Sequence, residues 1–305
     1  MRLKLGRPDL ASHADLFDVP AHSPGGGPSV TFLGVSTLLL DDGDSALLTD
    51  GFFSRPGMAR VLLGRIAPDR ARVDDCLARA GISRLEAVLP VHSHYDHALD
   101  SAYVAERTGA LLVGGASTAN LGRGHGLHEE RIRIATPGEP IGLGAWSVTL
   151  VASTHCPPDR YPGVIEEPVT PPAKVRRWRC GEAWSMLVRH QGGRSALVQG
   201  SAGFVAGALD GTPCDVAYLG VGQLGVQPDS YLHDYWQHTV RAVGARRVVL
   251  THWDDFFAPL DRPLRALPYA GDDLDRTLAV LLALARADDV TLSMPTVWRR
   301  EDPWA

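Results

Sequence analysis

After the first 28 residues, short apolar runs alternate with turn residues along the chain. SVTFLGV, STLLLDD and SALLTDG, within residues 29–51, predict three strands, and the Asp-Gly at the last junction predicts a hairpin turn. Helical periodicity follows near residues 57–63 and 73–80, and the second helix is expected to end at Gly81. RLEAVLP then predicts a strand that leads directly into His92.

The same mixture of strands and helices continues to the end of the chain. We expect a helix over residues 95–109, a short helix near 116–121, and later helices at about 230–243 and 272–286. The strand-like runs are ALLVGG, ERIRIAT, AWSVTLVAS, EAWSMLVRH, SALVQGS, CDVAYLGVG, RRVVLTHW and a last one near 289–294. Strand-rich and helix-bearing stretches thus occur once on each side of the middle, which predicts an α/β protein.

Two segments lack this periodicity. Residues 1–28 end in Ser-Pro-Gly-Gly-Gly-Pro, so we expect an N-terminal arm followed by one domain over residues 29–305. Residues 157–175, PPDRYPGVIEEPVTPPAKV, contain six prolines and neither helical nor strand periodicity. They predict a long ordered loop or a lid, because long loops inside compact domains often cover active sites.

Composition narrows the class of protein. Hydrophobic residues make up 45% and charged residues 21% of the chain, as in soluble globular proteins. The net charge is -5, and the only basic cluster is Lys174, Arg176, Arg177 and Arg179, which argues against a nucleic-acid-binding face. The chain has neither a run of about 20 apolar residues, which would span a membrane, nor a signal-peptide core. Four widely separated cysteines favour neither disulfides nor a thiolate zinc site, so a cytoplasmic location is expected.

Val91-His92-Ser93-His94-Tyr95-Asp96-His97 has the form HxHxDH and carries the chemistry of this sequence. In extended backbone, residues two apart point to the same side, so His92 and His94 can reach one metal ion. If a helix starts just after them, its first turn brings Asp96 and His97 to a second position. Imidazole and carboxylate suit zinc, and also iron or manganese.

Two further histidines follow apolar runs and complete this pattern. His155 comes after VTLVAST, and His252 comes after RRVVLT. Alone, each would be read as a hydrogen-bonded histidine at a strand end. Together with HxHxDH, they are the expected remaining ligands of a one- or two-metal site.

These motifs resemble the metallo-β-lactamase superfamily from about residue 29 to residue 294. The resemblance implies a four-layer αββα sandwich with metals at one edge. It also implies that Asp50, in Thr49-Asp50-Gly51, supports a metal ligand from behind. The layout is most similar to a subgroup with ascorbate-phosphate lactonases and N-acyl phosphatidylethanolamine phospholipase D, which shares the Asp-x-x-x-Leu-x-x-Gly found here at 215–222.

One departure from the family pattern concerns the bridge between the metals. Members usually place an aspartate in a Gly-Asp turn between the middle and last histidines, where it bridges both ions. The matching turn here is Gln199-Gly200-Ser201-Ala202-Gly203, and serine cannot supply an anionic bridge. Either Asp96, His97 and His252 hold the second metal weakly, or a bridging hydroxide acts alone.

The resemblance implies a hydrolase that uses a metal-bound hydroxide on an ester, lactone, amide or phosphodiester. His92, His94 and His155 would hold the first metal, and Asp96, His97 and His252 the second, with Asp96 also orienting the attacking hydroxide. We expect one or two Zn²⁺ per chain, with iron or manganese as alternatives. The partner would be a small-molecule substrate, with anionic compounds among the candidates; the oligomeric state is left open.

Two alternatives to a hydrolase stay open. One is a mononuclear iron dioxygenase that acts on a persulfide, and the other is a metal-binding scaffold without turnover. Near the site, Asp254 and Asp255 are expected to orient ligand histidines, because such histidines usually donate their second N–H to a carboxylate or carbonyl. Tyr231 or His233 could reach substrate from a helix, although helix packing is the simpler interpretation.

Overall fold

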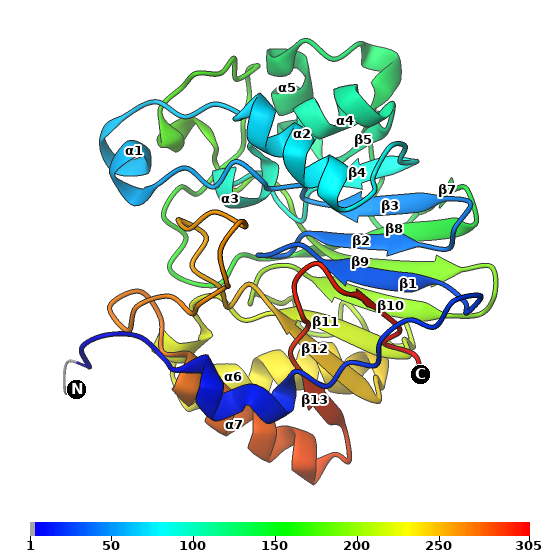
Figure 1. Cartoon of the computed structure of the whole chain (residues 1–305), viewed down its shortest axis with the longest axis vertical. Coiled ribbons are helices and arrows are strands. Elements are labelled where there is room, and N and C mark those ends of the chain that lie inside the picture. Colours follow the sequence, from blue (N-terminus) through cyan, green and yellow to red (C-terminus); the bar gives the residue numbers. More distant parts are fainter. Residues whose placement is uncertain (1–3) are drawn as a thin grey trace.

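The structure, a computed structural model, describes residues 4–305. Two seven-stranded sheets pack face to face, and helices cover the outer face of each (Figure 1). The layers therefore run helix, sheet, sheet, helix, as the family resemblance implies. No helix among residues 4–305 is long and apolar enough to cross a membrane.

The first sheet has the strand order β14-β1-β2-β3-β4-β5-β6. The strands from β14 to β3 pair antiparallel, and those from β3 to β6 pair parallel. Their bounds are β1 Ser29–Phe32, β2 Leu38–Asp41, β3 Ala46–Thr49, β4 Ala87–Leu89, β5 Leu111–Gly114, β6 Ile132–Ile134 and β14 Arg300–Glu301.

The second sheet has the order β13-β12-β11-β10-β9-β8-β7. Here β10 to β13 pair parallel, and β7 to β10 pair antiparallel. The bounds are β7 Pro140–Leu143, β8 Trp146–Ser153, β9 Ala183–His190, β10 Ser195–Gln199, β11 Val216–Gly220, β12 Arg247–Thr251 and β13 Thr291–Ser293. Parallel strands covered on both faces need continuous apolar runs, and every residue of β10 and β11 is buried.

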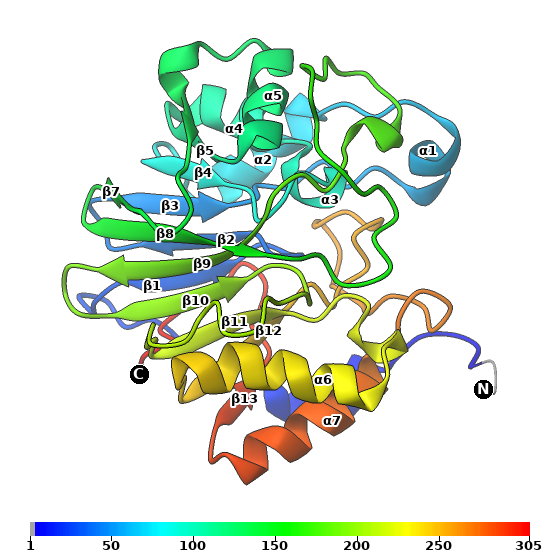
Figure 2. The same cartoon turned by 180° about the vertical axis from the view of Figure 1, so that it is seen from behind.

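Helices cover the two sheets unequally (Figures 1 and 2). The first sheet carries α2 Arg70–Arg79, α4 Ser101–Thr108 and α5 Ala116–His125, with the short helices α1 Met58–Leu63 and α3 Tyr95–Ala98 towards one edge. The second sheet carries α6 Asp229–Trp236 and α7 Leu274–Ala287.

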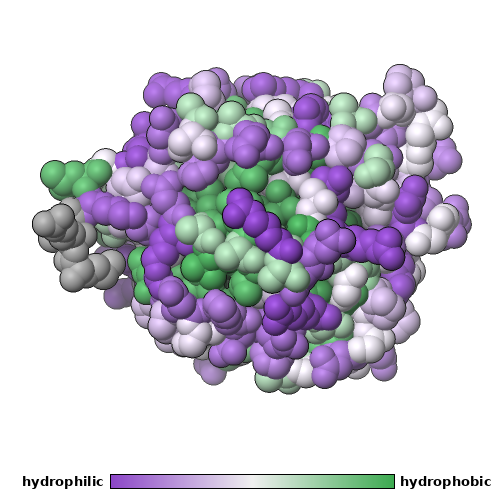
Figure 3. Space-filling model, turned by 90° about the horizontal axis from the view of Figure 1, so that it is seen from below, coloured by the Kyte–Doolittle hydropathy of each residue, from purple (hydrophilic) through white to green (hydrophobic). Residues whose placement is uncertain are grey.

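Figure 3 shows the molecule from below, where apolar residues gather in the middle and hydrophilic ones surround them.

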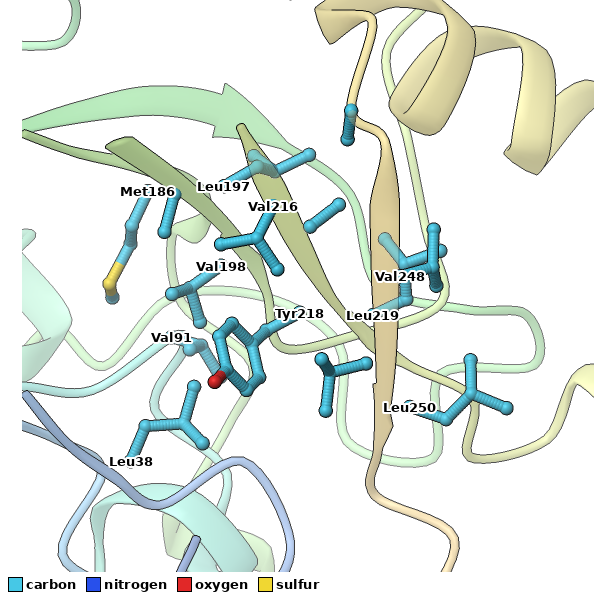
Figure 4. Close-up of a cluster of buried hydrophobic side chains, with 14 of the residues drawn as sticks. Leu38, Val91, Met186, Leu197, Val198, Val216, Tyr218, Leu219, Val248 and Leu250 are labelled. Carbon is cyan, nitrogen blue, oxygen red and sulfur yellow. The ribbon is translucent and has the colours of Figure 1, made fainter. Parts of the chain in front are cut away.

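The main core lies between the two sheets (Figure 4). Leu38 of the first sheet faces Met186, Val198 and Tyr218 of the second, and all four side chains are buried. Val91 joins this core just before the histidine motif begins, and Trp184 N–H of the second sheet donates to its carbonyl. The histidines therefore follow a segment that is fixed from both sheets.

Several expected elements differ in their extent. The helix expected over 95–109 is broken between α3 and α4, because Asp100 turns its carboxylate to accept from the N–H groups of Phe53 and Ser54. Helix α5 extends beyond residue 121 to His125, and α6 begins at Asp229 and continues as a π-helical turn to Arg241. The sequence pattern did not predict β7 or β14, which are short strands at sheet edges.

The segment before β1 packs on the domain. It contains a 3-10 helix, Leu10–Leu16, and the side chains of Leu16 and Val19 are buried in the main core. Ala21 forms a β-bridge with Glu301. The boundary at residue 28 stays a prediction.

Candidate metal centre

The six predicted ligands come together at one edge of the sandwich. His92, His94, Asp96 and His97 lie between β4 and the first turn of α3, His155 follows β8, and His252 follows β12. Sequence positions 160 residues apart therefore meet because the strands that precede them end at the same edge.

His92, His94 and His155 form the first cluster. One ligand atom from each lies within 4.8 Å of the others. Nε2 of His92 lies 3.1 Å from Nδ1 of His94, and the His155 ring centroid is 4.9 Å from that of His92 and 4.7 Å from that of His94. The planes of the three rings are nearly perpendicular to one another, with interplanar angles of 86°, 87° and 79°.

Asp96, His97 and His252 form the second cluster. Oδ2 of Asp96 is 3.6 Å from Nε2 of His252 and 3.8 Å from Nε2 of His97. The two clusters adjoin, since the ring centroids of His92 and His97 are 4.1 Å apart.

The residues present fit a divalent transition metal. Two nitrogens bound to one tetrahedral zinc at ~2.0–2.1 Å would lie about 3.3 Å apart, close to the spacing between His92 Nε2 and His94 Nδ1. His97 is fully buried and its Nε2 has no hydrogen-bond partner among the described residues, although its Nδ1 is hydrogen-bonded. A buried orphan nitrogen is costly without a partner, and a metal ion would provide one.

Burial and mutual proximity control the charge of these groups. Burial and, after it, the neighbouring His94 together lower the pKa of His155 to about 4, and burial also lowers the pKa of His92. Burial opposes ionisation of Asp96, but the charges of His97 and His252 hold the pKa of that carboxyl below its usual range. A neutral His92, a neutral His155 and an ionised Asp96 are in the protonation states that metal binding requires. Burial lowers the pKa of His252, but the Asp96 carboxylate beside it raises that pKa overall.

Asp50 supports the second cluster from behind. Its Oδ2 accepts from Nδ1 of His97 at 2.8 Å, and its Oδ1 accepts from the N–H of Val91 at 2.9 Å. One buried carboxylate therefore fixes both the backbone that enters the motif and the ring of its last histidine. This is the supporting position that the family resemblance implied for Asp50.

The backbone of His252 is held by a second buried arrangement. Its N–H donates to Val35 O at 2.7 Å, and Val35 N–H donates to Oδ1 of Asp254 at 2.8 Å. Oδ2 of Asp254 pairs with Nη2 of Arg55 at 2.6 Å, and both side chains are fully buried. Val35 and His252 both have positive φ angles, +52° and +57°, which non-glycine residues adopt only where their surroundings enforce it.

Asp254 therefore acts on the backbone beside His252. The sequence had suggested that it would instead orient the ring of a ligand histidine. Asp255 contacts no ligand histidine either, since its carboxylate pairs with Arg7 and Arg265. The expectation that Asp254 and Asp255 orient the rings of ligand histidines is therefore wrong. The Tyr231 hydroxyl donates to Ala202 O, and its ring packs against that of Phe204 with centroids 5.4 Å apart and planes tilted by 51°, as expected for helix packing.

Sequence reasoning missed Asp159. This residue lies in the proline-rich segment, and its Oδ1 is 3.2 Å from Nε2 of His94. Nδ1 of the same ring faces His92, so Asp159 occupies the side of His94 that points away from the first cluster. Its position four residues after His155 was the only sequence signal that could have suggested it.

Cys180 lies near His94 and Asp159 and completes a third group of possible ligands. Burial raises the pKa of the Cys180 thiol well above its usual range, and the nearby Asp159 raises it further. A neutral thiol is a poor metal ligand, because the thiolate is the binding form. We therefore assign Asp159 to His94 and not to a further metal.

Ser201 lies beside the first cluster, but its hydroxyl is already engaged. Its Oγ accepts from the N–H of Cys156 at 3.0 Å, next to His155. The serine thus holds the backbone next to a predicted ligand. The carboxylate that the family usually places in this turn has no counterpart among residues 199–203.

Comparison with known proteins identifies the family. Residues 30–176 match the sequence profile of the metallo-β-lactamase superfamily. A UPF0173 metal-dependent hydrolase of Heliobacterium modesticaldum is 25% identical over 236 residues, 74% of this chain and 83% of that protein. A UPF0173 metal-dependent hydrolase of Christiangramia forsetii is 31% identical over 91 residues, 30% of this chain and only 34% of that protein.

A solved structure has the same fold. The metallo-β-lactamase fold protein YhfI of Bacillus subtilis superposes with a TM-score of 0.54 and 14% identity, over 90% of this chain and 98% of that one. With the two facing sheets and the histidine motif, these matches show that residues 30–176 carry the sequence profile of the metallo-β-lactamase superfamily and that the domain has the metallo-β-lactamase fold. Both sequence relatives are named metal-dependent hydrolases. The narrower resemblance to lactonases and N-acyl phosphatidylethanolamine phospholipase D stays a prediction.

Proposed function

We propose that the protein hydrolyses an ester, lactone, amide or phosphodiester bond in a small molecule at a centre of one or two divalent metal ions, with zinc as the leading candidate. The observation that carries this proposal is the contact between two three-residue clusters, where the His92 and His97 rings lie 4.1 Å apart. Two adjoining sets of histidines with one carboxylate suit paired hydrolytic metals.

In this proposal the ligands divide between two positions. His92, His94 and His155 would hold the first metal, and Asp96, His97 and His252 the second. A metal bound there would lower the pKa of a coordinated water from 15.7 to about 7 and so supply a nucleophile at neutral pH. Asp50 and Asp159 would then orient His97 and His94, since each lies within hydrogen-bond distance of a ring nitrogen.

Asp96 is the proposed catalytic carboxylate as well as a ligand. Its side chain is the only carboxylate in the two clusters, and neighbouring histidines favour its ionised form. An ionised carboxylate accepts hydrogen bonds, so Asp96 can orient an attacking water towards the substrate. Its side chain is 14% exposed, so it can also reach a bound substrate.

Two half-buried aromatic rings border the proposed site. The Tyr161 ring centroid is 6.5 Å from that of His94, and the Phe256 centroid is 5.7 Å from that of His252. Because Tyr161 belongs to the proline-rich segment, residues 157–175, this segment begins beside the proposed metal centre. Its position supports the proposed role in covering the substrate. Asp159, in the same segment, adds negative charge beside the first cluster and so reduces the expected preference for anionic substrates.

Metal analysis tests the proposal. Plasma mass spectrometry of purified protein should give between one and two transition-metal ions per chain, and His94→Ala should remove most of them. His128→Ala, which changes an exposed histidine outside the clusters, should leave the metal content unchanged. Unchanged metal content in His94→Ala would overturn the ligand assignment.

A panel of lactone, thioester, amide and phosphodiester substrates then tests the reaction. Hydrolysis of at least one class by the native protein, abolished in His94→Ala, is expected. A protein with one iron that consumes oxygen with a persulfide would support the dioxygenase alternative. A metal-loaded protein that is inert towards every class would support a scaffold without turnover.

A further inference from the structure

A cleft lies at the opposite end of the second sheet from the candidate metal centre. It has a volume of about 620 Å³ and is bordered by the β9–β10 hairpin, the segments that lead into β11 and β12, and Trp304. The predicted ligand His252 follows the end of β12, whereas the cleft touches Arg247 at its beginning. At about 3.3 Å per residue, the two sites lie roughly 16 Å apart along the strand.

Arginines without acidic partners line this cleft. They come from β9, from the hairpin turn and from the start of β12, so they are distant in sequence. None of them forms an ion pair among residues 4–305, whereas another surface arginine, Arg241, pairs with Asp288 at 2.7 Å. The four are Arg189, Arg194, Arg246 and Arg247.

The four guanidinium groups retain most of their hydrogen-bonding capacity. Arg189 donates one bond to Pro213 O and Arg247 donates one to Ser293 Oγ, while each guanidinium has five N–H donors. The acidic side chain in the lining, Asp215, is engaged elsewhere, since its Oδ2 accepts from both the N–H and the hydroxyl of Ser195. The remaining N–H donors of the four guanidinium groups have no hydrogen-bond partner among residues 4–305.

We propose that this cleft binds a small anion that carries two or more phosphate or carboxylate groups. Four arginines against one acidic side chain, Asp215, leave the lining with a surplus of positive charge, which a multivalent anion would neutralise. Guanidinium groups match phosphate and carboxylate oxygens in a two-point geometry. The volume suits a small molecule and not a macromolecular segment, because small-molecule sites have volumes of about 300–1,000 Å³.

Calorimetric titration of the metal-loaded protein tests this site. Pyrophosphate and citrate serve as separate probes, so that their relative affinity distinguishes phosphate from carboxylate ligands. The double variant Arg194→Gln/Arg246→Gln should weaken binding of the preferred probe about tenfold or more, because charge-assisted hydrogen bonds are lost. Binding should also weaken as salt concentration increases. The control Arg133→Gln removes an exposed arginine on β6 and should leave binding unchanged.

Both probes could also bind metal ions, and the variants separate the two sites. Binding at the metal centre would persist in the double variant and would overturn the proposal, as would the absence of binding by either probe. Hydrogen exchange provides a second measurement, independent of the variants' stability. Pyrophosphate or citrate should slow exchange in residues 189–195 and 243–247, and slowing confined to residues 92–97 would contradict the assignment.

Discussion

Oδ1 of Asp159 lies 3.2 Å from Nε2 of His94, and this contact joins the proline-rich segment to the histidine motif. The ring's other nitrogen faces His92. A carboxylate on one side of an imidazole fixes its tautomer and leaves the opposite nitrogen free as a metal ligand.

We therefore expect Asp159→Asn to lower kcat/KM of the preferred substrate about 10–100-fold, because the orienting charge on His94 is lost. Metal content should fall less than in His94→Ala, since the ligand itself remains. Steady-state kinetics and metal analysis measure both effects. Glu167→Gln, an exposed change in the same segment, is the control. Equal activity of Asp159→Asn and the control would show that Asp159 does not orient His94.

Asp50→Asn should weaken the second metal position more than the first. An amide can still accept from Val91 N–H, so the backbone is expected to hold, but His97 loses its charged acceptor. Metal titration into apo-protein should show a loss of about 10–100-fold in affinity at the weaker site. Asp210→Asn at an exposed turn serves as the control. An equal loss of metal affinity at both positions would show that Asp50 does not act through His97 alone.

Breaking the buried Arg55–Asp254 pair should destabilise the fold strongly. Arg55→Met leaves the Asp254 carboxylate buried without its cation, which typically costs about 3–5 kcal/mol in unfolding free energy. Urea unfolding measures this loss. Arg241→Met breaks an exposed pair with Asp288 and should cost only about 0–1 kcal/mol. Similar losses in the two variants would mean that the buried pair has no special role beside His252.

Ser201→Asp should tighten the second metal position. With Asp96 as the only carboxylate ligand, repulsion between two cations about 3.5–4 Å apart is poorly offset, so the two native affinities should be unequal. An added carboxylate in this turn would reduce that repulsion. Calorimetric metal titration compares native protein, Ser201→Asp and the uncharged control Ser201→Asn. Two equally tight native sites that Ser201→Asp leaves unchanged would show that another residue provides the bridge.

Glu301 should make the fold less stable as the pH rises. Burial raises the pKa of Glu301 from 4.5 to about 7, and the hydrogen bonds from Thr296 and Arg299 offset this only in part. The folded state therefore keeps a proton that the unfolded state releases, so stability present below pH 4.5 is lost as the pH rises to about 7. In Glu301→Gln, the free energy of unfolding should therefore fall by about 1–3 kcal/mol less over this pH range than in the native protein.

Urea unfolding at pH 5, 6, 7 and 8 measures the difference between native protein and Glu301→Gln. Any pH dependence that arises at the metal centre is common to both proteins and cancels in this difference. A constant difference across the four pH values would show that Glu301 titrates alike in the folded and unfolded chains.

The sequence determined most strands and the types of candidate ligand, because both depend on local pattern. Apolar runs predicted β10, β11 and β12, since a strand covered on both faces needs apolar side chains throughout. HxHxDH predicted where the metal centre begins, because its spacing places neighbouring imidazoles on one side of extended backbone. Edge strands such as β14, with only two residues, carry no such periodicity and were missed.

Only the tertiary structure decided how the ligands are held. Asp159 and Arg55 lie in segments without periodicity. Apart from the closeness of Asp159 to His155 in the sequence, no local pattern indicates that these residues contact His94 and Asp254. The partner of each is set by how distant loops meet at the sheet edge, because hydrogen bonds and ion pairs between loops depend on the packing of both sheets. The arginine cleft has the same origin: residues 189 and 246 line one cleft only because β9, β10, β11 and β12 lie side by side.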